Sequence, residues 1–320
     1  MTAHKLLYYS EQGPDGKFFH RPRKKLEKYY KILIVDEVSM LPSTMWELLL
    51  THRIPVIACG DPGQLPPVAA EDNNHVLDNP HVFLDEIMRQ AQDSEIIRLS
   101  MHVREGKPLS TFEATGAQVK IFNKNQVSLG MYEWADQILC ATNKTRNDIN
   151  NIVRQSRGYG IEPCQGDKII SLSNHWEFMS NKDGWSLTNG SIGTLDNYYI
   201  DHFYAPRFIH EGPIWYMFST MSFEGDKFEG IPIDYQCLKT GAPALTGIEE
   251  YKMRKNGRCS LDPPYDFAYA YAITTHKAQG SEWPRVLVVE ESFPYQKDEH
   301  IRWLYTACTR ASEKLVVIKD

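Results

Sequence analysis

Two adjacent carboxylates, Asp36 and Glu37, directly follow a run of four apolar residues, Ile32–Val35. An apolar run without polar alternation is typical of a strand that is buried on both faces of a parallel sheet. Ligands of open α/β sheets bind at the carboxyl ends of the strands, so the two acids are expected where a ligand would lie. Asp36 could hold Mg²⁺ through a water molecule, and Glu37 could polarise a water aimed at a γ-phosphate. A buried strand that merely ends in solvated acids is the alternative.

A second polar loop follows a second apolar run. The run Ile54–Cys59 predicts another buried strand, and the segment Ser43–His52 between the two strands predicts a short helix with a serine or threonine at its start to cap it. A strand–helix–strand unit brings the loop after the second strand to the same sheet edge as the first pair of acids. We therefore expect Asp61 and Gln64 beside them. The Gln64 amide both donates and accepts, which suits it to sense a phosphate oxygen or an attacking water.

Two arginines are candidates to contact a phosphate. The segment Phe83–Arg104 has a helical apolar stripe, and Arg89 stands at the end of its first part, where a surface salt bridge is the alternative role. Arg310 lies near the end of the predicted helix Arg302–Ala311 and is a natural arginine finger, a positive charge placed against a transition state. Gly280 would let a phosphate approach backbone N–H groups.

The remaining elements predict a second α/β lobe with an insertion. Asp136–Thr142 predicts a buried strand followed by a helix, and Leu315–Ile318 predicts the closing strand. Between them, a long aromatic-rich stretch lacks helical periodicity and predicts a small β-barrel-like insertion. Its aromatic side chains could stack on bases, although core packing is the favoured role for any single one. Near the start, Pro14-Asp15-Gly16 predicts the turn of a small hairpin, with a solvated loop as the alternative.

Composition narrows the functional classes. The chain has 320 residues, a net charge of −6 and 24% charged residues, so a nucleic-acid site must be a local groove and not a basic tail. Six cysteines without a CxxC pair argue against a zinc ribbon and a disulfide scaffold, and indicate a reducing cytoplasm. No apolar run reaches membrane-spanning length, and the first residues lack the shape of a signal peptide, so no membrane partner is expected.

Six segments occur in a characteristic order: DEVSM, GDPGQLPP, LDEIMRQ, ATNKTR, TTHKAQGSEW and YTACTRA. Together they resemble the superfamily 1 DNA helicases, most closely the RecD-like and phage Dda-like group, superfamily 1B, which moves 5′ to 3′. The resemblance covers nearly the whole chain. It implies an ATP- and Mg²⁺-dependent helicase that acts on single-stranded and fork DNA in a bacterial or phage-infected cell.

The same resemblance implies roles for individual residues. The residues implied in ATP hydrolysis are Asp36, which also holds Mg²⁺, Glu37, Gln64, Arg89 and Arg310. Those implied in contacting the nucleotide are Asp61, Gly280 and Glu282. Those implied in contacting single-stranded DNA are Thr2, His4, Asn143, Lys144, Thr275 and His276.

The resemblance also implies an α/β architecture of two RecA-like parallel-sheet lobes. Residues 1–115 would form the first, incomplete lobe, with a pin hairpin at 10–28 that splits the duplex. Residues 116–165 and 266–320 would form the second lobe, and 166–265 an SH3-like β insertion.

One family motif is missing from the sequence, the phosphate loop GxxxxGK[ST]. The only Gly-Lys pairs, Gly16-Lys17 and Gly106-Lys107, are followed by Phe and Pro. In the family this loop precedes the segment that Thr2 and His4 resemble. We therefore expect this chain alone to hydrolyse ATP poorly and the Ile32–Val35 strand to have an unpaired apolar edge. A separate N-terminal fragment carrying the loop would complete a split enzyme, whereas a truncated reading frame is the rival explanation. The alternative function is an ATPase-dead DNA-binding module or a scaffold in a replication or recombination complex.

Overall fold

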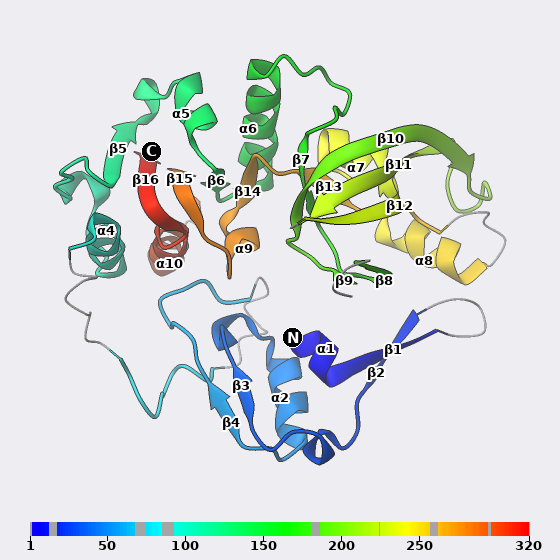
Figure 1. The fold of residues 1–320 in the computed structure, drawn as a ribbon, viewed down its shortest axis with the longest axis horizontal. Helices are drawn as coiled ribbons and strands as arrows, with labels where there is room; N and C mark the ends of the chain where they lie inside the picture. Colours follow the sequence, from blue (N-terminus) through cyan, green and yellow to red (C-terminus); the bar gives the residue numbers. More distant parts are fainter. Residues whose placement is uncertain are drawn as a thin grey trace. The chain divides into compact units, whose positions relative to one another are not determined.

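The computed structural model describes residues 2–12, 18–67, 75–84, 93–180, 186–223, 225–256, 262–293 and 296–319. It divides into two compact units, Met1–Val127 with Ala278–Asp320, and Ser128–Lys277. The predicted boundaries of lobes and insertion differ from this division and stay a prediction. Figure 1 labels the helices and strands of both units.

The first unit begins with a capped helix and a hairpin. Helix α1 (Ala3–Leu7) starts at Thr2, whose hydroxyl accepts a hydrogen bond from the Lys5 N–H at 3.3 Å. Strands β1 (Tyr8–Gln12) and β2 (Phe18–Pro22) then pair antiparallel, which confirms the predicted hairpin, while its turn lies outside the described residues. The 3₁₀ helix η1 (Leu26–Lys28) follows.

The predicted strand–helix–strand unit is confirmed. Strands β3 (Leu33–Val35) and β4 (Val56–Ala58) are parallel, and η2 (Val38–Met40) and α2 (Ser43–Thr51) connect them (Figure 1). The predicted side-chain cap is wrong, because α2 starts after Pro42, which makes no side-chain hydrogen bond. Proline has a fixed φ, and the extended ψ of 146° at Pro42 starts the helix there. The core of this region is formed by Leu7, Leu26, Leu33, Val38, Leu41, Met45, Leu49 and Ile54.

The expectation that β3 and β4 are buried on both faces is wrong. Leu33 is buried, but Ile34 is 71% exposed and Ile57 is 49% exposed. Side chains alternate along a strand, so residues next to a core position point to the opposite face. Among the described residues β3 pairs only with β4, and the core lies on one side of this pair. Within the described residues, β3 therefore has the predicted unpaired apolar edge.

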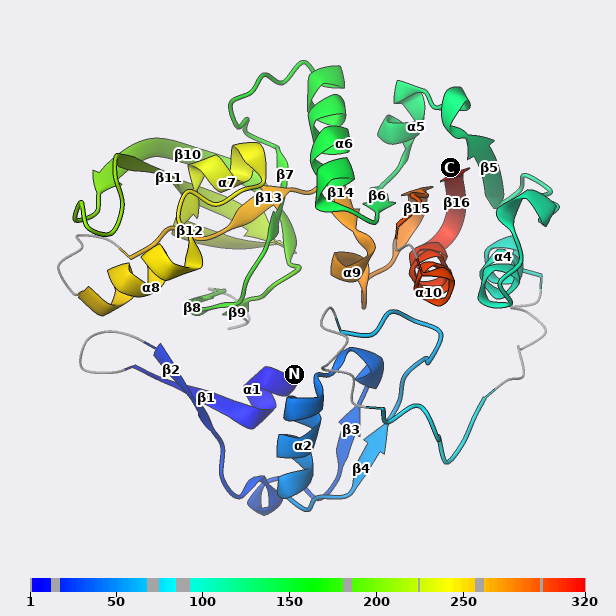
Figure 2. The same cartoon turned by 180° about the vertical axis from the view of Figure 1, so that it is seen from behind.

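The rest of the first unit contains three parallel strands and two longer helices. Strand β5 (Val119–Asn123) pairs with β16 (Ala311–Lys319), which pairs with β15 (Trp283–Val289). Helices α4 (Glu95–Arg104) and α10 (Lys297–Cys308) pack side by side, as Figure 2 shows from behind. Of the predicted helix at 83–104, residues 83 and 84 are not helical, Glu95–Arg104 are helical, and 85–92 lie outside the described residues. The short helices η4 (Leu109–Thr111) and η5 (Lys124–Gln126) complete this part.

The second unit contains the predicted second-lobe strand and helix. Strand β6 (Gln137–Cys140) is buried throughout and follows α5 (Leu129–Trp134). Helix α6 (Asn143–Ser156) comes next, and β6 pairs in parallel with β14 (Ala272–Thr274), which leads into α9 (Thr275–Ala278). In the first unit the parallel strand order is β15-β16-β5, and in the second unit β14 lies beside β6.

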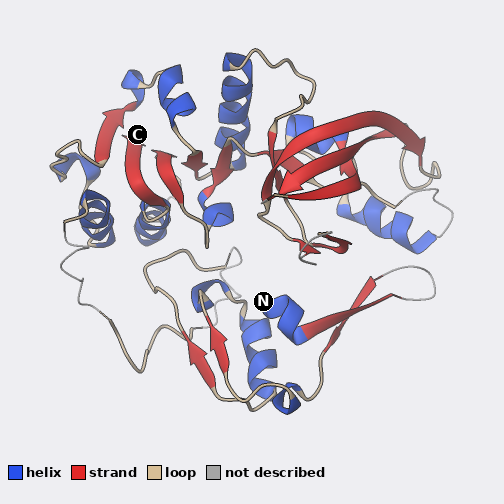
Figure 3. Ribbon diagram, in the orientation of Figure 1, coloured by secondary structure: helices blue, strands red, loops and turns tan. Residues whose placement is uncertain are grey.

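The predicted β insertion contains an antiparallel sheet, whose strands are red in Figure 3. The strand order of this sheet is β12-β11-β10-β7-β13. Its strands are β7 (Lys168–Ser171), β10 (Ile192–Tyr204), β11 (Pro213–Phe223), β12 (Asp226–Asp234) and β13 (Phe267–Tyr269). Short strands β8 (His175–Met179) and β9 (Ser186–Leu187) and helices α7 (Tyr235–Thr240) and α8 (Gly247–Asn256) accompany it.

The aromatic side chains of the insertion divide into two groups. Phe203, Tyr216, Phe223 and Phe228 are buried, as core packing predicts, while Tyr199, Tyr204 and Trp215 are exposed. In the part of the chain that the structure describes, no helix is both long and apolar enough to cross a membrane. The five cysteines there are all free thiols.

Candidate nucleotide site

The first carboxylate pair sits on a strained turn at the end of β3. Glu37 has a φ of +51°, a left-handed conformation that is unusual for a non-glycine residue. Three hydrogen bonds hold the turn: Glu37 N–H to Asp36 Oδ1 at 2.9 Å, Val38 N–H to Cys59 O at 2.9 Å, and Cys59 N–H to Val35 O at 2.8 Å. Such backbone strain costs about 1–3 kcal/mol and clusters at functional sites. The βαβ unit thus fixes the position of Glu37.

Asp61 is held from two other elements of the first unit. One of its oxygens accepts the Gly63 N–H at 2.8 Å and lies 3.4 Å from the Arg104 guanidinium at the end of α4. The other accepts the Tyr305 hydroxyl of α10 at 2.6 Å. Burial, and then this bond to a carboxylate, raise the pKa of Tyr305 to about 12. The Arg104 guanidinium also lies 5.5 Å from the centre of the Tyr305 ring, within cation–π range.

The loop that carries Gln64 is bonded to the same helix. Leu65 N–H donates to Thr306 Oγ1 at 3.0 Å, and Gln279 Nε2 donates to Leu65 O at 2.9 Å. The Gln64 side-chain oxygen is buried and has no hydrogen-bond partner among the described residues. A buried acceptor without a partner is costly unless something fills it. Gln64 could therefore accept a hydrogen bond from a nucleophilic water.

Arg310 follows α10 and is 7% exposed. Its guanidinium donates to Thr306 O at 3.1 Å, to Ser281 O at 3.3 Å and to Thr309 Oγ1 at 3.1 Å, which fixes its orientation. Burial lowers the pKa of Arg310, and the negative charges around it, with Glu37 first, oppose that shift.

Glu37 and Arg310 influence each other's charge. Burial raises the pKa of Glu37, Arg310 counteracts this, and the carboxylates of Asp36 and Asp61 raise it further. The structure therefore brings together these three predicted acids and the predicted arginine finger. A carboxylate with a raised pKa is suited to polarise water, and a buried arginine is suited to stabilise developing negative charge.

The other nucleotide candidates are less fixed by the structure. Gly280 has a φ of +77°, and a Cβ added there would meet open space. Glu282 is exposed but close enough to act on the charge of Arg310. Arg89 lies outside the described residues.

Asp36 fits the predicted magnesium role. Its carboxylate is exposed, and Mg²⁺ usually keeps several waters and binds through one or two carboxylates. Among the residues that the structure describes, no group of three or more His, Cys, Asp or Glu side chains could hold a metal ion. Asp36 would hold the ion through water.

The candidate DNA contacts lie in different surroundings. His4, Asn143 and Lys144 are exposed, and so is Thr2, which caps α1. Thr275 is fully buried, and its hydroxyl donates to Cys140 O at 3.4 Å, which ties the end of β14 to β6. The DNA contacts of these residues stay predictions.

Sequence reasoning missed the residues that support the site, namely Arg104, Tyr305, Thr306 and Gln279. Tyr305 and Thr306 precede Arg310 in the segment YTACTRA, so their closeness to the predicted arginine was the available signal. Their partners are 244 and 241 positions away in the chain, and no local pattern indicates such pairs.

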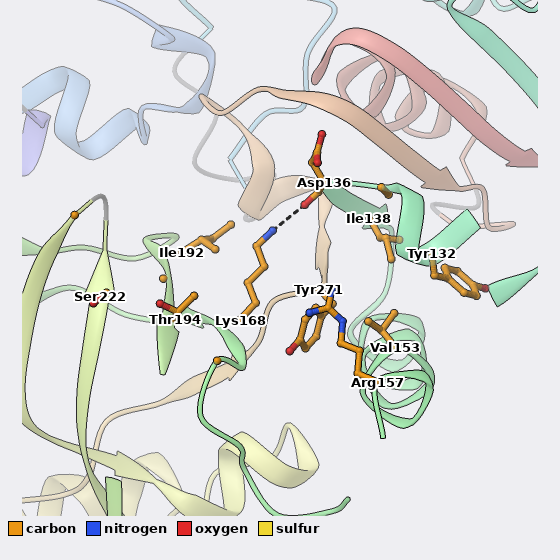
Figure 4. A pocket seen from close by; sticks show the side chains of 14 residues that line it. Tyr132, Asp136, Ile138, Val153, Arg157, Lys168, Ile192, Thr194, Ser222 and Tyr271 are labelled. Atoms are coloured by element: carbon orange, nitrogen blue, oxygen red, sulfur yellow. Dashed lines mark hydrogen bonds between the residues drawn. The ribbon is translucent and has the colours of Figure 1, made fainter. Parts of the chain in front are cut away.

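The second unit contains a cavity of about 480 Å³ that the sequence did not indicate (Figure 4). The Lys168 ammonium donates to Asp136 O at 2.9 Å and to Gln137 Oε1 at 2.8 Å, and burial lowers the pKa of Lys168 to about 8. The Arg157 guanidinium lies 4.6 Å from the centre of the Tyr271 ring. These bonds join β7 to the start of β6, so the polar groups of this cavity serve the fold.

Comparison with protein families gives two matches. Residues 1–125 match the AAA domain model, and residues 269–318 match the UvrD-like helicase C-terminal domain model. A curated relative, the ATP-dependent RecD2 DNA helicase of Deinococcus radiodurans, is 26% identical over 98% of this chain. The chain spans 39% of the length of that relative.

Solved structures share the fold. The Pif1 helicase of Bacteroides in complex with ADP-AlF3 and single-stranded DNA has a TM-score of 0.53 and 15% identity, over 99% of this chain and 78% of that one. The Pif1 helicase of Candida albicans has a TM-score of 0.50 and 18% identity, over 90% and 71%. The family matches and the shared fold place the chain in superfamily 1. Within that class, the chain belongs to superfamily 1B, in the RecD/Pif1-like group.

Proposed function

We propose that this chain carries the hydrolytic carboxylates and the arginine finger of an ATP-driven DNA helicase that acts on single-stranded DNA and moves 5′ to 3′. The observation that carries the proposal is the pair Glu37 and Arg310, whose charges act on each other beside Asp36 and Asp61. A pure binding module has no use for this arrangement. The RecD2 relative is named an ATP-dependent DNA helicase, which supports the same activity.

The residues supply a hydrolysis step as follows. Glu37 polarises the attacking water, whose other contact is the partnerless Gln64 oxygen. Arg310 stabilises the charge that develops on the transferred phosphoryl group. Asp36 would hold Mg²⁺ through water, and the bound ion would neutralise phosphate charge. The loop bearing Asp61 and Gln64 is hydrogen-bonded to α10, so the nucleotide state at Arg310 is transmitted to that loop.

The proposal includes a phosphate loop from another segment, because residues 1–320 contain no GxxxxGK[ST] sequence. That segment could be joined to this chain or separate from it. We also propose that the parallel strands form RecA-like lobes and that the antiparallel sheet is an SH3-like insertion. The hairpin β1–β2 is proposed as the pin that splits fork DNA. The strand pairings support these assignments.

The test is DNA-stimulated ATPase activity of the chain after a fragment with the phosphate loop is added. We expect Glu37→Gln to reduce turnover by about 100-fold or more, because a general base contributes that much. Glu47→Gln, the same substitution at an exposed position of α2, is the matched control and should leave turnover unchanged.

A different outcome would favour the alternative function. Single-stranded DNA binding without any turnover in the presence of that fragment would identify an ATPase-dead binding module or scaffold. The missing phosphate-loop sequence is the observation that keeps this second candidate open.

A further inference from the structure

A second charged site lies in the first unit, where the chain leaves the hairpin. A pocket of about 490 Å³ is lined by the cations Arg23, Lys24, Lys25 and Arg53 and by one acid, Glu27. We call it the basic pocket. On a chain with a net charge of −6, four cations around one cavity are a local concentration of positive charge.

The basic pocket is separate from the nucleotide site. Arg53 comes shortly before β4, whereas Asp36 and Asp61 follow β3 and β4, so the two sites lie at opposite ends of these parallel strands. Helix α2 starts on the carboxylate side and ends at the pocket. Its nine residues span about 13 Å at 1.5 Å per residue. The basic pocket therefore cannot contact the phosphates of a small nucleotide that is bound at the carboxylates.

A buried polar group without a partner lines the pocket. His52, directly after α2, is only 8% exposed, and its Nε2 has no hydrogen-bond partner among the described residues. A buried ring nitrogen left unpaired costs free energy, which a bound oxygen ligand would recover. At the end of α2, Leu49 O and Leu50 O accept the backbone N–H groups of His52 and Arg53, and no carbonyl within the described ranges bonds to His52 Nε2.

One cation of the pocket is held in a fixed orientation, and the other three are available to bind an anion. Arg23 Nε donates to Tyr8 O at 3.1 Å, and its guanidinium lies 5.9 Å from the centre of the Tyr9 ring, so this side chain is oriented. No carboxylate within the described ranges forms an ion pair with Lys24, Lys25 or Arg53. Lys25 and Arg53 have φ values of +63° and +54°, and Glu37 of the nucleotide site shares this uncommon conformation.

We infer that the basic pocket binds a phosphate group. Several lysine and arginine donors around one cavity, with a buried imidazole nitrogen on its wall, match the charge and the acceptor oxygens of phosphate. The phosphate could belong to a nucleic-acid backbone or to a free oligophosphate. The nucleic-acid source rests on the proposed helicase function, whereas the oligophosphate source does not.

The experiment uses the full chain and the double variant Lys24→Gln/Arg53→Gln. The control is Lys28→Gln/Lys31→Gln, which removes the same charge from exposed residues outside the pocket. Tripolyphosphate binding is measured by titration calorimetry, and binding of labelled single-stranded and duplex DNA by fluorescence anisotropy across a salt series. The ¹⁵N resonance of His52 Nε2 is followed during the tripolyphosphate titration.

For a backbone phosphate, we expect the pocket variant to bind DNA about 10-fold more weakly, and its slope of log affinity against log salt to fall by about 1 to 2 relative to the control. If the ligand is a free oligophosphate, we expect tripolyphosphate to shift the His52 resonance of the unmodified chain. We also expect the heat of tripolyphosphate binding to be lost in the pocket variant and kept in the control variant. Equal DNA slopes in both variants, together with an unmoved His52 resonance, would overturn the inference. The pocket variant changes none of the residues that the ATPase test changes. Failure of the helicase proposal would therefore be seen separately, because turnover would be absent while oligophosphate binding stayed intact.

Discussion

Glu95 is a buried carboxylate at the start of the helix whose last residue, Arg104, contacts Asp61 of the candidate nucleotide site. It is 2% exposed at the first turn of α4 and accepts backbone N–H groups from Gln118 at 2.9 Å, Val119 at 3.0 Å and Thr115. Burial alone raises its pKa, but these hydrogen bonds outweigh burial and lower the pKa to about 2. The carboxylate thus joins the start of α4 to the start of β5, and α4 ends at the arginine that contacts Asp61.

The perturbation is Glu95→Gln, which keeps the shape and removes the charge. A pKa near 2 in the folded state and 4.5 in the unfolded state corresponds to about 3 kcal/mol of stability, and we expect about 2 kcal/mol after allowance for water at the helix end. Because the folded pKa is depressed, this contribution is complete above pH 4.5 and is lost as pH falls toward 2. The variant should therefore be less stable than the parent at pH 7, and the difference should shrink below pH 4.5.

The assay is urea denaturation of both proteins, followed by circular dichroism, at several pH values between 7 and 3. Glu105→Gln is the matched control, because Glu105 lies directly after the same helix, is exposed, and pairs only with Lys107 among the described residues. Its effect should be much smaller. A Glu95→Gln stability loss that is equal at pH 7 and pH 3 would refute the charge-based explanation, since the loss would then come from packing alone.

Three further changes test other parts of the structure. Tyr305→Phe should lower the free energy of unfolding by about 1–2 kcal/mol in urea denaturation, because it removes only the hydroxyl that donates to Asp61 at 2.6 Å; an unchanged midpoint would show that water replaces this bond fully. The parent protein should become more stable between about pH 8 and pH 10, because the pKa of Lys168 is about 8 in the folded state and 10.5 in the unfolded state, so the unfolded chain holds an extra proton in that interval. Lys168→Met should abolish this rise in stability. Thermal melts across that pH range check it, and the same rise in both proteins would contradict the assignment. Ile34→Thr should leave stability within about 0.5 kcal/mol, because this side chain is 71% exposed, and a loss as large as that of a core deletion would show that it is covered.

Local patterns predicted the elements whose residues interact with near neighbours in the sequence. The apolar runs at β3, β6 and β16 predicted strands, and the turn residues around Pro14 predicted the hairpin, because backbone pairing follows from side-chain alternation and turn chemistry. The extent of burial was not predictable in the same way. The run Ile32–Val35 is apolar throughout, but burial on a second face requires a neighbour that a four-residue pattern does not specify.

The order of the site residues was visible in the sequence, but their supports were not. Asp36, Glu37, Asp61 and Arg310 belong to segments with distinctive composition, so their types and spacing indicate phosphate chemistry. Tyr305 and Arg104 resemble ordinary helix residues, and only the folded structure shows both on the same Asp61 carboxylate. Side-chain pairs between distant segments depend on how whole elements pack, which helical or strand periodicity does not encode.

The residues that support the candidate site also couple its parts to one another. Tyr305 and Thr306 lie one turn before Arg310, and each bonds to the loop that carries Gln64. A displacement of Arg310 that moves the end of α10 must therefore move that loop or break two hydrogen bonds, one of them to a carboxylate. Glu37 stands on a turn that is hydrogen-bonded to Cys59, directly before the same loop. Glu37, Gln64 and Arg310, which we propose as the water-polarising group, the phosphate sensor and the arginine finger, are thus linked through backbone and side-chain bonds within one compact unit. Coupling between them needs no long pathway, because the connection is a few bonds long and each bond has a named donor and acceptor.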